Sequence, residues 1–576
     1  MSLIKETESY LTNLVNSLGY EINEVKLEKC KMPEFGQYQI NIAMNLASIA
    51  HANPRDIAQK IVDALDDRFV NVNIQGPGFI NVTFNNDLLI NYSNECLNDF
   101  NKYVDKFDKT KTIVLDYGGA NIAKTLHVGH VRCNIGEAVK RVYNLFGDKT
   151  ISDVHWGDWG TPLGLVIREI KERYPELPFF DETYTGEYPK LNITNDELGI
   201  IYPAASLRKK EDPDYANEAR ILTEELQSGK RGIRALWEQI VDISKSDCKN
   251  IYNYLNCTFD LDYGESTSDK YVKDVLNFLN EKGVTEESDG ALIMHVKEET
   301  DNKEMPPLML VKSDGGVLYD TTELATIYQR VKDFDPDMIC YFTDNRQGLH
   351  FEQAFRGAYK SGLVRNDVEL KHFEFGTING SDGKPFKTRD GGVMSLKGLI
   401  KLVYDAIEPK IKEDIVGEER INVANKLTIA TIKYSDLLPF RTTDYIFDVD
   451  KFTSFEGKTG IYILYTTTRI KSLLNKLDSD DVKIKNIPNE DVLNVLVKLT
   501  ELSKVLKQCY QDASLSYLCE FTYELASLFN KFYGNNNISN EENEDNKETF
   551  IALSKLVYNV LHNILNILAI DEVDKM

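Results

Sequence analysis

The first hundred residues alternate helix-like and strand-like hydrophobic patterns. Apolar positions recur at helical spacing over residues 4–18 and 54–65, and Pro54 suits the first position of a helix. A glycine-rich turn at residues 76–78 leads into an alternating, strand-like run. We therefore expect a small α/β domain over residues 1–105, in which the polar residues 101–110 form a linker to the next domain.

The middle of the chain, residues 106–400, combines short apolar runs with longer helix-like stretches. Runs typical of strands lie at residues 112–117, 308–311 and 338–342. Such alternation predicts a parallel sheet covered by helices. Residues 174–214 are rich in Pro, Glu, Asp, Tyr and Thr and lack a clear period, so we expect an insertion near residues 165–265.

From about residue 401 onward, long amphipathic patterns dominate. They cover residues 461–477, 491–511, 515–533 and 549–568, and the last two are separated by a polar, acidic loop at 534–546. These patterns predict an all-helical domain over residues 401–576. The expected fold class is α/β: a central parallel-sheet domain with an insertion, a small α/β domain before it and an all-α domain after it.

Composition narrows the class of protein without indicating a function. The chain has 576 residues, of which 42% are hydrophobic. No apolar run approaches the ~18 residues that a membrane span requires, so we expect a soluble protein with no membrane partner. Its eight cysteines include no CxxC pair, which argues against structural zinc and against a disulfide framework. The first residues lack the apolar stretch of a signal peptide, and together these features predict a cytoplasmic protein with reduced thiols.

The net charge bears on possible partners. At −24 it argues against indiscriminate nucleic-acid binding, because phosphates are held chiefly by Lys and Arg. A multidomain protein can nevertheless carry one basic surface on an acidic body, and that distribution favours a selective, salt-sensitive contact. The composition therefore leaves a specific nucleic-acid partner open.

The sequence His127-Val128-Gly129-His130 follows the strand-like run at 112–117. In open parallel sheets, ligands bind at the carboxyl ends of strands, so this motif lies where a binding crevice is expected. A glycine lets the backbone approach a triphosphate closely, and imidazole N–H groups can donate to oxygens whose charge grows as pyrophosphate departs. The motif indicates adenylyl transfer, although two nearby histidines also occur by chance.

A second motif lies late in the same region, at residues 384–392 (Lys-Pro-Phe-Lys-Thr-Arg-Asp-Gly-Gly). On its own it could be a solvated basic turn. A mobile loop with cations and flexible glycines can also fold over a triphosphate. Together with the upstream histidines, it resembles the two signatures of class I aminoacyl-tRNA synthetases.

The surrounding sequence is similar to the arginyl-tRNA synthetase family in particular, and the resemblance covers essentially the whole chain. The most characteristic segment is His155-Trp156-Gly157-Asp158-Trp159-Gly160. The other matching segments are residues 116–132, 259–266, 318–325, 344–350, 456–462 and 568–576.

The resemblance implies a two-step reaction. Arginine and ATP, the latter with Mg²⁺, would give arginyl-adenylate and pyrophosphate, and the arginyl group would then move to the 2′-OH of the terminal adenosine of tRNA(Arg). The central domain would be Rossmann-like, with no dedicated protein metal site. The N-terminal domain would be an additional tRNA-contacting domain, and the C-terminal domain would bind the anticodon. The family habit implies a monomer whose arginine activation requires tRNA.

The resemblance also assigns residues to the ATP phosphates and the adenylate. The class I pattern Lys-Met-Ser-Lys-Ser falls on residues 384–388 and matches both lysines but neither residue between them. In the family, the lysine ahead of the histidines is thought to compensate, and here it is Lys124. The expected catalytic and ATP-binding residues are His127, Gly129, His130, Lys124, Lys384, Lys387 and Thr388.

Arginine recognition requires carboxylates, because a guanidinium is permanently charged and presents forked donors that a carboxylate matches in two bonds. The resemblance implies Asp116 and Glu323 for the guanidinium, Tyr319 and Gln347 as pocket partners, and Asn121 for the amino-acid backbone. Read singly, Tyr319 could be ordinary core and Glu323 an exposed helix residue. The family commonly has aspartate at the position of Glu323, and the extra methylene could be absorbed by the shorter Asp116 across the pocket.

Two groups of residues are candidates for tRNA contact. A loop in the first domain carries Tyr38, Gln39 and Asn41, which could equally be a hairpin turn packed on its own domain. In the last domain, Tyr462, Tyr465 and Arg469 share one helical face, which suits stacking on unpaired anticodon bases, although such stripes are often core.

Three other functions remain open. A related synthetase could act on another amino acid, which the expected carboxylate pocket and the Gly157-Asp158-Trp159-Gly160 segment oppose. A catalytically silent paralogue could act as an RNA-binding module, which retention of both histidines and Lys124 opposes. A small-molecule adenylyltransferase could also use the histidine motif, but it would need neither the first nor the last domain.

Overall fold

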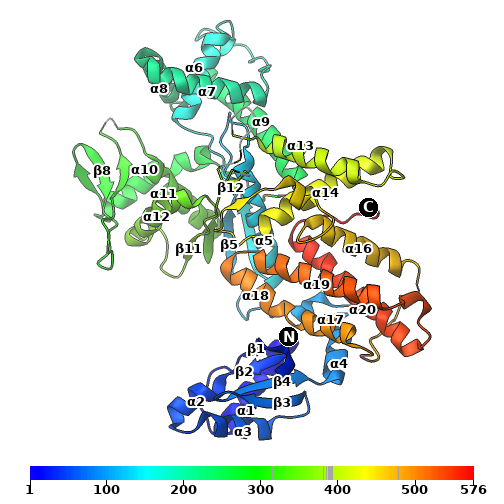
Figure 1. Cartoon of the computed structure of the whole chain (residues 1–576). Helices are drawn as coiled ribbons and strands as arrows, with labels where there is room; N and C mark the ends of the chain where they lie inside the picture. The colour runs from blue at the N-terminus through cyan, green and yellow to red at the C-terminus, as the bar shows by residue number, and fades with distance from the viewer. Residues whose placement is uncertain (314, 381, 385, 387–392, 478) are drawn as a thin grey trace.

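The computed structural model describes residues 1–576 apart from 314, 381, 385, 387–392 and 478. Figure 1 shows a small N-terminal unit at one end, a central α/β part and a helical part beside it. This arrangement matches the fold class expected from the hydrophobic pattern.

The N-terminal unit is an antiparallel sheet covered by helices. Its strands lie in the order β1-β2-β4-β3, with bounds Leu27–Lys29, Tyr38–Ile40, Phe79–Phe84 and Phe69–Gln75. Its helices are α1 (Leu3–Ser17), α2 (Ile42–Ala50) and α3 (Pro54–Ala64), and α4 (Asn86–Cys96) follows. Pro54 is the first residue of α3, as expected, and the Asn53 side chain caps that helix.

The central part contains a parallel sheet with the strand order β11-β10-β5-β6. The strands are Glu369–His372, Met338–Tyr341, Thr112–Asp116 and Lys149–Asp153. The register pairs Asp116 with Tyr341 on one side and with Asp153 on the other, so these three side chains stand at the same carboxyl edge. The chain crosses from one side of β5 to the other at this point, which is where open α/β sheets bind ligands.

Helices cover both faces of this sheet. On β5, Ile113 and Leu115 belong to the same core cluster as Val139 of α5 (Cys133–Phe146). Val114 points to the other face and joins the cluster that includes Leu324. That face is covered by α10 (Glu265–Glu281), α11 (Tyr319–Phe334) and α12 (Gly348–Ser361). Burial on both faces explains why these strands are continuous apolar runs.

One sequence expectation for the central part needs correction. Residues 308–311 do form a strand, β9 (Leu308–Val311), but it belongs to a separate antiparallel sheet with β8 (Ala291–Met294) and β7 (Glu286–Ser288). The expected insertion, despite its poor periodicity, is largely helical. Its helices are α6 (Thr161–Arg173), α7 (Asn195–Glu211), α8 (Pro213–Gln227) and α9 (Arg231–Tyr254).

The helical part contains the elements that amphipathic spacing predicted, with two differences. The pattern at 491–511 is divided between α17 (Glu490–Thr500) and α18 (Leu502–Asp512). The expected acidic loop is shorter than 534–546, because α19 reaches Asn535 and α20 begins at Glu544. The helices are α13 (Leu396–Ile407), α14 (Gly417–Leu437), α15 (Val449–Phe452), α16 (Gly460–Leu474), α17, α18, α19 (Ser516–Asn535) and α20 (Glu544–Ile567).

Buried polar contacts join the helical part to the rest of the chain. The Arg132 guanidinium, 1% exposed, donates to Asp436 Oδ1 of α14 at 2.9 Å. Strand β13 (Tyr445–Ile446) pairs in parallel with β12 (Ile378–Asn379) of the central part. The chain beyond residue 401 is therefore tied to the central part by charge as well as by backbone pairing.

One helix among the described residues, α20, is long and apolar enough to span a membrane by length and composition. Its apolar window is 67% buried inside the protein. A core helix of a folded domain passes the same test, and α20 packs against α16 and α19. The helix is therefore weak evidence for a membrane span.

Candidate active site

A cavity of about 480 Å³ opens at the carboxyl edge of the parallel sheet. Eight of the residues expected to bind ATP or arginine line it: Asp116, Asn121, His127, Gly129, His130, Tyr319, Glu323 and Gln347. It is also lined by residues that the sequence analysis did not assign to a ligand, among them His155, Glu265, Tyr341, Asp344 and Arg346. The structure thus brings most of the expected site together at the expected edge.

The two histidines of the first motif hold each other in place. The Gly129 N–H donates to His127 Nδ1, and the His127 N–H donates to His130 Nδ1, each at a distance of 3.1 Å. The ring centroids are 4.1 Å apart. His127 Nδ1 accepts the Gly129 backbone proton, so the neutral ring of His127 carries its own proton on Nε2 and can donate it to a ligand oxygen. His130 Nδ1 contacts both the N–H and the carbonyl oxygen of His127, at 3.1 and 3.2 Å, so it accepts from the first in one tautomer and donates to the second in the other.

Both imidazoles are neutral near pH 7. Burial, followed by the positive charges of Arg346 and Lys124, lowers the pKa of His127. Burial and the neighbouring His127 lower the pKa of His130 to about 3. The site therefore offers phosphate oxygens neutral N–H donors, while formal positive charge comes from lysine and arginine side chains nearby.

The described lysines in and near the two motifs lie in different surroundings. The Lys124 ammonium lies 4.5 Å from the ring centroid of Tyr202 in α7 and does not line the cavity. The Lys384 side chain is exposed, and its backbone N–H donates to Asp382. Lys387 and Thr388 lie outside the described residues. Just beyond them, the Val128 N–H donates to Met394 O at 2.9 Å, so the segment that follows the second motif pairs with the first motif.

The Trp156-Gly157-Asp158 segment supports the cavity wall. An added Cβ on Gly157 would come within 2.4 Å of Asn121 Oδ1, so only glycine leaves room for this side chain. Asp158 is 1% exposed and accepts from both the backbone N–H and the hydroxyl of Ser266, at 2.9 and 2.8 Å. The segment thereby fixes both Asn121 and the start of α10, where Glu265 lies.

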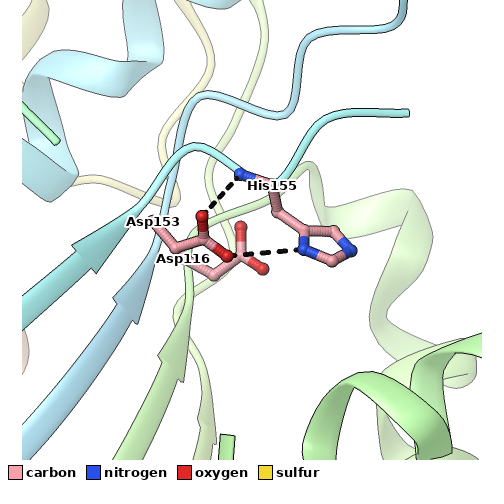
Figure 2. Close-up of side chains that lie close together, drawn as sticks. All are labelled: Asp116, Asp153 and His155. Carbon is pink, nitrogen blue, oxygen red and sulfur yellow. Dashed lines mark hydrogen bonds and ion pairs between the residues drawn. The ribbon is translucent and has the colours of Figure 1, made fainter. Parts of the chain in front are cut away.

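Asp116 is engaged by the protein itself. Arg330 of α11, which is fully buried, donates through Nη2 to Asp116 Oδ2 at 2.5 Å and to Asp153 Oδ2 at 2.9 Å. His155 Nδ1 lies 3.4 Å from Asp153 Oδ2, and Figure 2 shows the histidine turned toward the two carboxylates. Asp116 lines the cavity, but one of its oxygens is bound by a guanidinium of the chain.

Charge balance argues against a metal ion at this cluster, although Asp116, Asp153 and His155 have suitable ligand types within 4.8 Å. Burial alone would lower the pKa of His155, but its hydrogen bond to Asp153 and the charge of Asp116 raise it to about 9. A protonated imidazole cannot ligate a metal. With Arg330 also cationic, the two carboxylates are already neutralised, and the cluster is best described as a buried ion-pair network.

Two glutamates line the cavity, and one of them has a buried oxygen without a partner in the described structure. Glu323 is 5% exposed, and its Oε1 has no hydrogen-bond partner in the described structure. Burial would raise the pKa of Glu323, but the neighbouring His350, whose Nε2 lies 3.9 Å from Glu323 Oε2, lowers it, so this carboxylate is ionised. Burial, with the nearby Asp158 and Glu323 carboxylates, raises the pKa of Glu265 to about 7. An ionised buried oxygen without a donor indicates a cationic ligand.

The remaining pocket partners surround Glu323. Tyr319 is 51% exposed at the start of α11, so it is not the ordinary core residue that the sequence left possible. Its ring centroid is 4.7 Å from that of His350. Gln347 is exposed on the cavity rim, beside Arg346, whose guanidinium is held by two hydrogen bonds to Asp344. Arg346 is a further cation at the mouth that the sequence analysis missed.

The candidate tRNA residues of the N-terminal unit differ in their access to solvent. Tyr38 is 2% exposed, and its hydroxyl lies 2.5 Å from Thr500 Oγ1 of α17. This side chain therefore packs between the N-terminal sheet and the helical part, and the expectation of an open contact residue is not met. Gln39 and Asn41 are half-buried and donate to Asn81 and Glu28.

The candidate anticodon residues of α16 are half-buried. Arg469 donates to Asn530 Oδ1 at 2.8 Å and to the Tyr465 hydroxyl at 2.6 Å. Tyr465 and Arg469 line a cavity of about 400 Å³ at the end of the chain, and Tyr462 accepts from the Asn530 amide. This face of α16 is only partly buried, because its polar atoms are hydrogen-bonded at the edge of an open cavity.

Comparison with known proteins covers the whole chain. Residues 3–84 match the arginyl tRNA synthetase N-terminal domain, 93–449 the catalytic domain of class I (R) tRNA synthetases, and 463–576 the DALR anticodon binding domain. The arginine--tRNA ligases of Alkaliphilus oremlandii and Agathobacter rectalis are each 42% identical, with 100% of both chains covered.

Solved structures have the same fold. The arginyl-tRNA synthetase of Plasmodium falciparum superimposes with a TM-score of 0.83 at 24% identity, covering 100% of this chain and 99% of that one. The Thermus thermophilus arginyl-tRNA synthetase gives 0.78 at 17% identity, with 100% of both covered. The curated relatives are similar over the full length of this chain, three domain families match it, and the fold is shared. This chain therefore belongs to the class I arginyl-tRNA synthetase family.

Proposed function

We propose that the protein attaches arginine to tRNA(Arg) in two ATP-dependent steps, arginyl-adenylate formation followed by transfer to the 2′-OH of the terminal adenosine, and so supports translation. The observation that carries the proposal is the chemistry of one cavity. It is lined by Glu323, which is ionised and buried with one oxygen that has no hydrogen-bond partner among the described residues, and by the imidazoles of His127 and His130, of which His127 carries its proton on Nε2. A guanidinium and a triphosphate would each find complementary groups.

On the ATP side, His127 and His130 would donate to phosphate oxygens and to the adenylate, and Gly129 would let the nucleotide approach the backbone. An added Cβ at Gly129 would lie 2.9 Å from His127 Cε1, so a side chain here would push the ring out of place. Lys124, just ahead of the first motif, would supply positive charge, as would Lys384 and Lys387 of the second motif, and Thr388 would contribute a hydroxyl donor. The triphosphate would bring its own Mg²⁺.

On the arginine side, we propose a different pair of carboxylates from the pair that the sequence suggested. Glu323 keeps its role, but Asp116 already holds Arg330, so we assign Glu265 as the second carboxylate toward the guanidinium. Asp116 would act through its remaining oxygen and through the placement of His155 and Arg330. Asn121, Tyr319 and Gln347 remain candidates for the amino-acid backbone and the pocket wall.

The other two parts of the chain would serve tRNA. We propose that residues 1–105 and 401–576 flank the catalytic region 106–400 as tRNA-contacting parts, with Gln39 and Asn41 at one end. Tyr462, Tyr465 and Arg469 would contact the anticodon, since Tyr465 and Arg469 border an open cavity. We further propose a cytoplasmic monomer.

The activity is tested by arginine-dependent exchange of pyrophosphate into ATP, with and without total tRNA. We expect exchange only when tRNA is present, because the family couples activation to tRNA. Citrulline, which replaces the guanidinium by a neutral urea of the same shape, should support no exchange, because recognition relies on charge.

The outcomes separate the competing functions. Exchange with another amino acid, and none with arginine, would indicate a synthetase of different specificity. A folded protein with no exchange under either condition would indicate a silent paralogue. Exchange that survives removal of both residues 1–105 and 401–576 would favour a small-molecule adenylyltransferase.

The pH dependence of arginine binding tests the role of Glu265. Its pKa in the free protein is about 7 because burial raises it, and a bound guanidinium would lower it. Binding below pH 7 would therefore release a proton, and the KM for arginine should fall by up to about tenfold per pH unit as pH rises toward 7, then level off. Glu265→Gln should remove this slope, while the KM for ATP, measured on the same samples, should not follow it.

A further inference from the structure

Helix α7 of the inserted segment lies directly on the residues that precede the first motif. An added Cβ on Gly199 would come within 2.9 Å of Thr125 Cγ2, so the helix backbone and this residue are in close contact. Three residues further along α7, on the same face, the Tyr202 ring lies beneath Lys124, with its centroid 4.5 Å from Nζ. The insertion therefore contacts Lys124 and Thr125, which precede His127 by three and two residues.

The helix that carries Tyr202 is fixed at its start. Thr194 and Glu197 form a reciprocal capping box, and the Asn195 amide donates to Asp247 Oδ2 of α9 at 2.9 Å. Lys397 Nζ donates to Asp247 Oδ1 at 2.7 Å. Lys397 belongs to α13, which follows the second motif. The position of α7 is thus tied to both segments that carry the signatures.

An aromatic ring holds a cation without neutralising it. A carboxylate partner would cancel the charge of Lys124 and would have to be displaced when a phosphate arrives, whereas the ring quadrupole attracts the ammonium and leaves its charge intact. The charge of Lys124 does reach the imidazoles, since it contributes to the lowered pKa of both His127 and His130. A lysine held in this way is aligned beside the site and still fully charged.

We propose that Tyr202 is a positioning residue for adenylate formation, holding the Lys124 ammonium by its ring face so that the charge is directed toward the ATP phosphates. The proposal rests on the function proposed above and on Lys124 acting in it. It gives the inserted helix a part in the chemistry, although Tyr202 does not line the catalytic cavity.

The test compares two substitutions in tRNA-dependent pyrophosphate exchange. Tyr202→Leu removes the aromatic face and should lower kcat/KM for ATP by about 3- to 10-fold, with the KM for arginine within twofold. Tyr202→Phe keeps the face and should stay within twofold of the parent enzyme. The control is Ile200→Ala, because this residue is 65% exposed on the same helix and should have no effect.

A double-mutant cycle decides whether the effect passes through Lys124. In a Lys124→Ala background, Tyr202→Leu should cause no further loss, because there is no ammonium left to place. An equal loss in both backgrounds, or a Tyr202→Phe variant as impaired as Tyr202→Leu, would overturn the proposal. So would an unchanged Tyr202→Leu enzyme. Absence of exchange in the parent enzyme would instead contradict the proposed function.

Discussion

Replacing Glu323 by glutamine should raise the KM for arginine by roughly 10²- to 4 × 10³-fold. The substitution keeps the size of the side chain and removes its charge, so the guanidinium would lose its main buried counter-ion. Removing one member of a buried ion pair costs about 3–5 kcal/mol, which corresponds to this range. The measurement is the KM for arginine in tRNA-dependent pyrophosphate exchange, with the KM for ATP expected to stay within a few fold.

Comparing two variants of Glu323 separates the effect of its charge from the effect of its side-chain length. Glu323→Asp keeps the charge and shortens the side chain to the length common in the family, and we expect a changed KM for arginine, within about tenfold of the parent value. The matched control is Glu281→Gln at the exposed end of α10, which should behave as the parent enzyme. An unchanged KM in both Glu323 variants would place this residue outside the arginine pocket.

The local pattern of apolar and polar residues was sufficient to predict the helices and strands that position the site. The apolar run of β5 is buried on both faces and ends at Asp116, and the turn after it leads to His127. Because strand ends and the following loops are set by nearby residues, the edge of the sheet where the cavity opens could be expected. Strand β9 could not be assigned to its sheet, because a short apolar run does not reveal its pairing partner.

Contacts between distant segments account for what the sequence missed. Arg330 lies 214 positions from Asp116, and nothing in the spacing indicates that its guanidinium would bind that carboxylate. Tyr38 is similarly buried by Thr500, 462 positions away. In each case a polar side chain expected to face a ligand is satisfied by the protein. For Glu265 a signal did exist, since a carboxylate at the start of an amphipathic helix lay within one of the matching segments.

Lys124→Ala should lower the rate of tRNA-dependent pyrophosphate exchange by roughly 10²-fold, and Lys384→Ala should lower it less. Removing one group that stabilises developing charge in a transition state costs about 10²–10³ in kcat. Lys124 is held beside the imidazoles, and its charge acts on both of them. The Lys384 side chain is exposed to solvent, where the same charge is screened more strongly. The comparison uses kcat for exchange at saturating arginine and ATP.

The ranking of these two lysines decides which motif carries the phosphate charge in this chain. If the second motif dominates, Lys384→Ala will be the more damaging substitution, and the contact between Lys124 and Tyr202 will have no catalytic consequence. If Lys124 dominates, its loss should affect exchange more than binding of ATP, because a cation that acts on the departing pyrophosphate contributes mainly in the transition state. A rise in the KM for ATP with unchanged kcat would therefore contradict the assignment even if the order of the two variants were as expected.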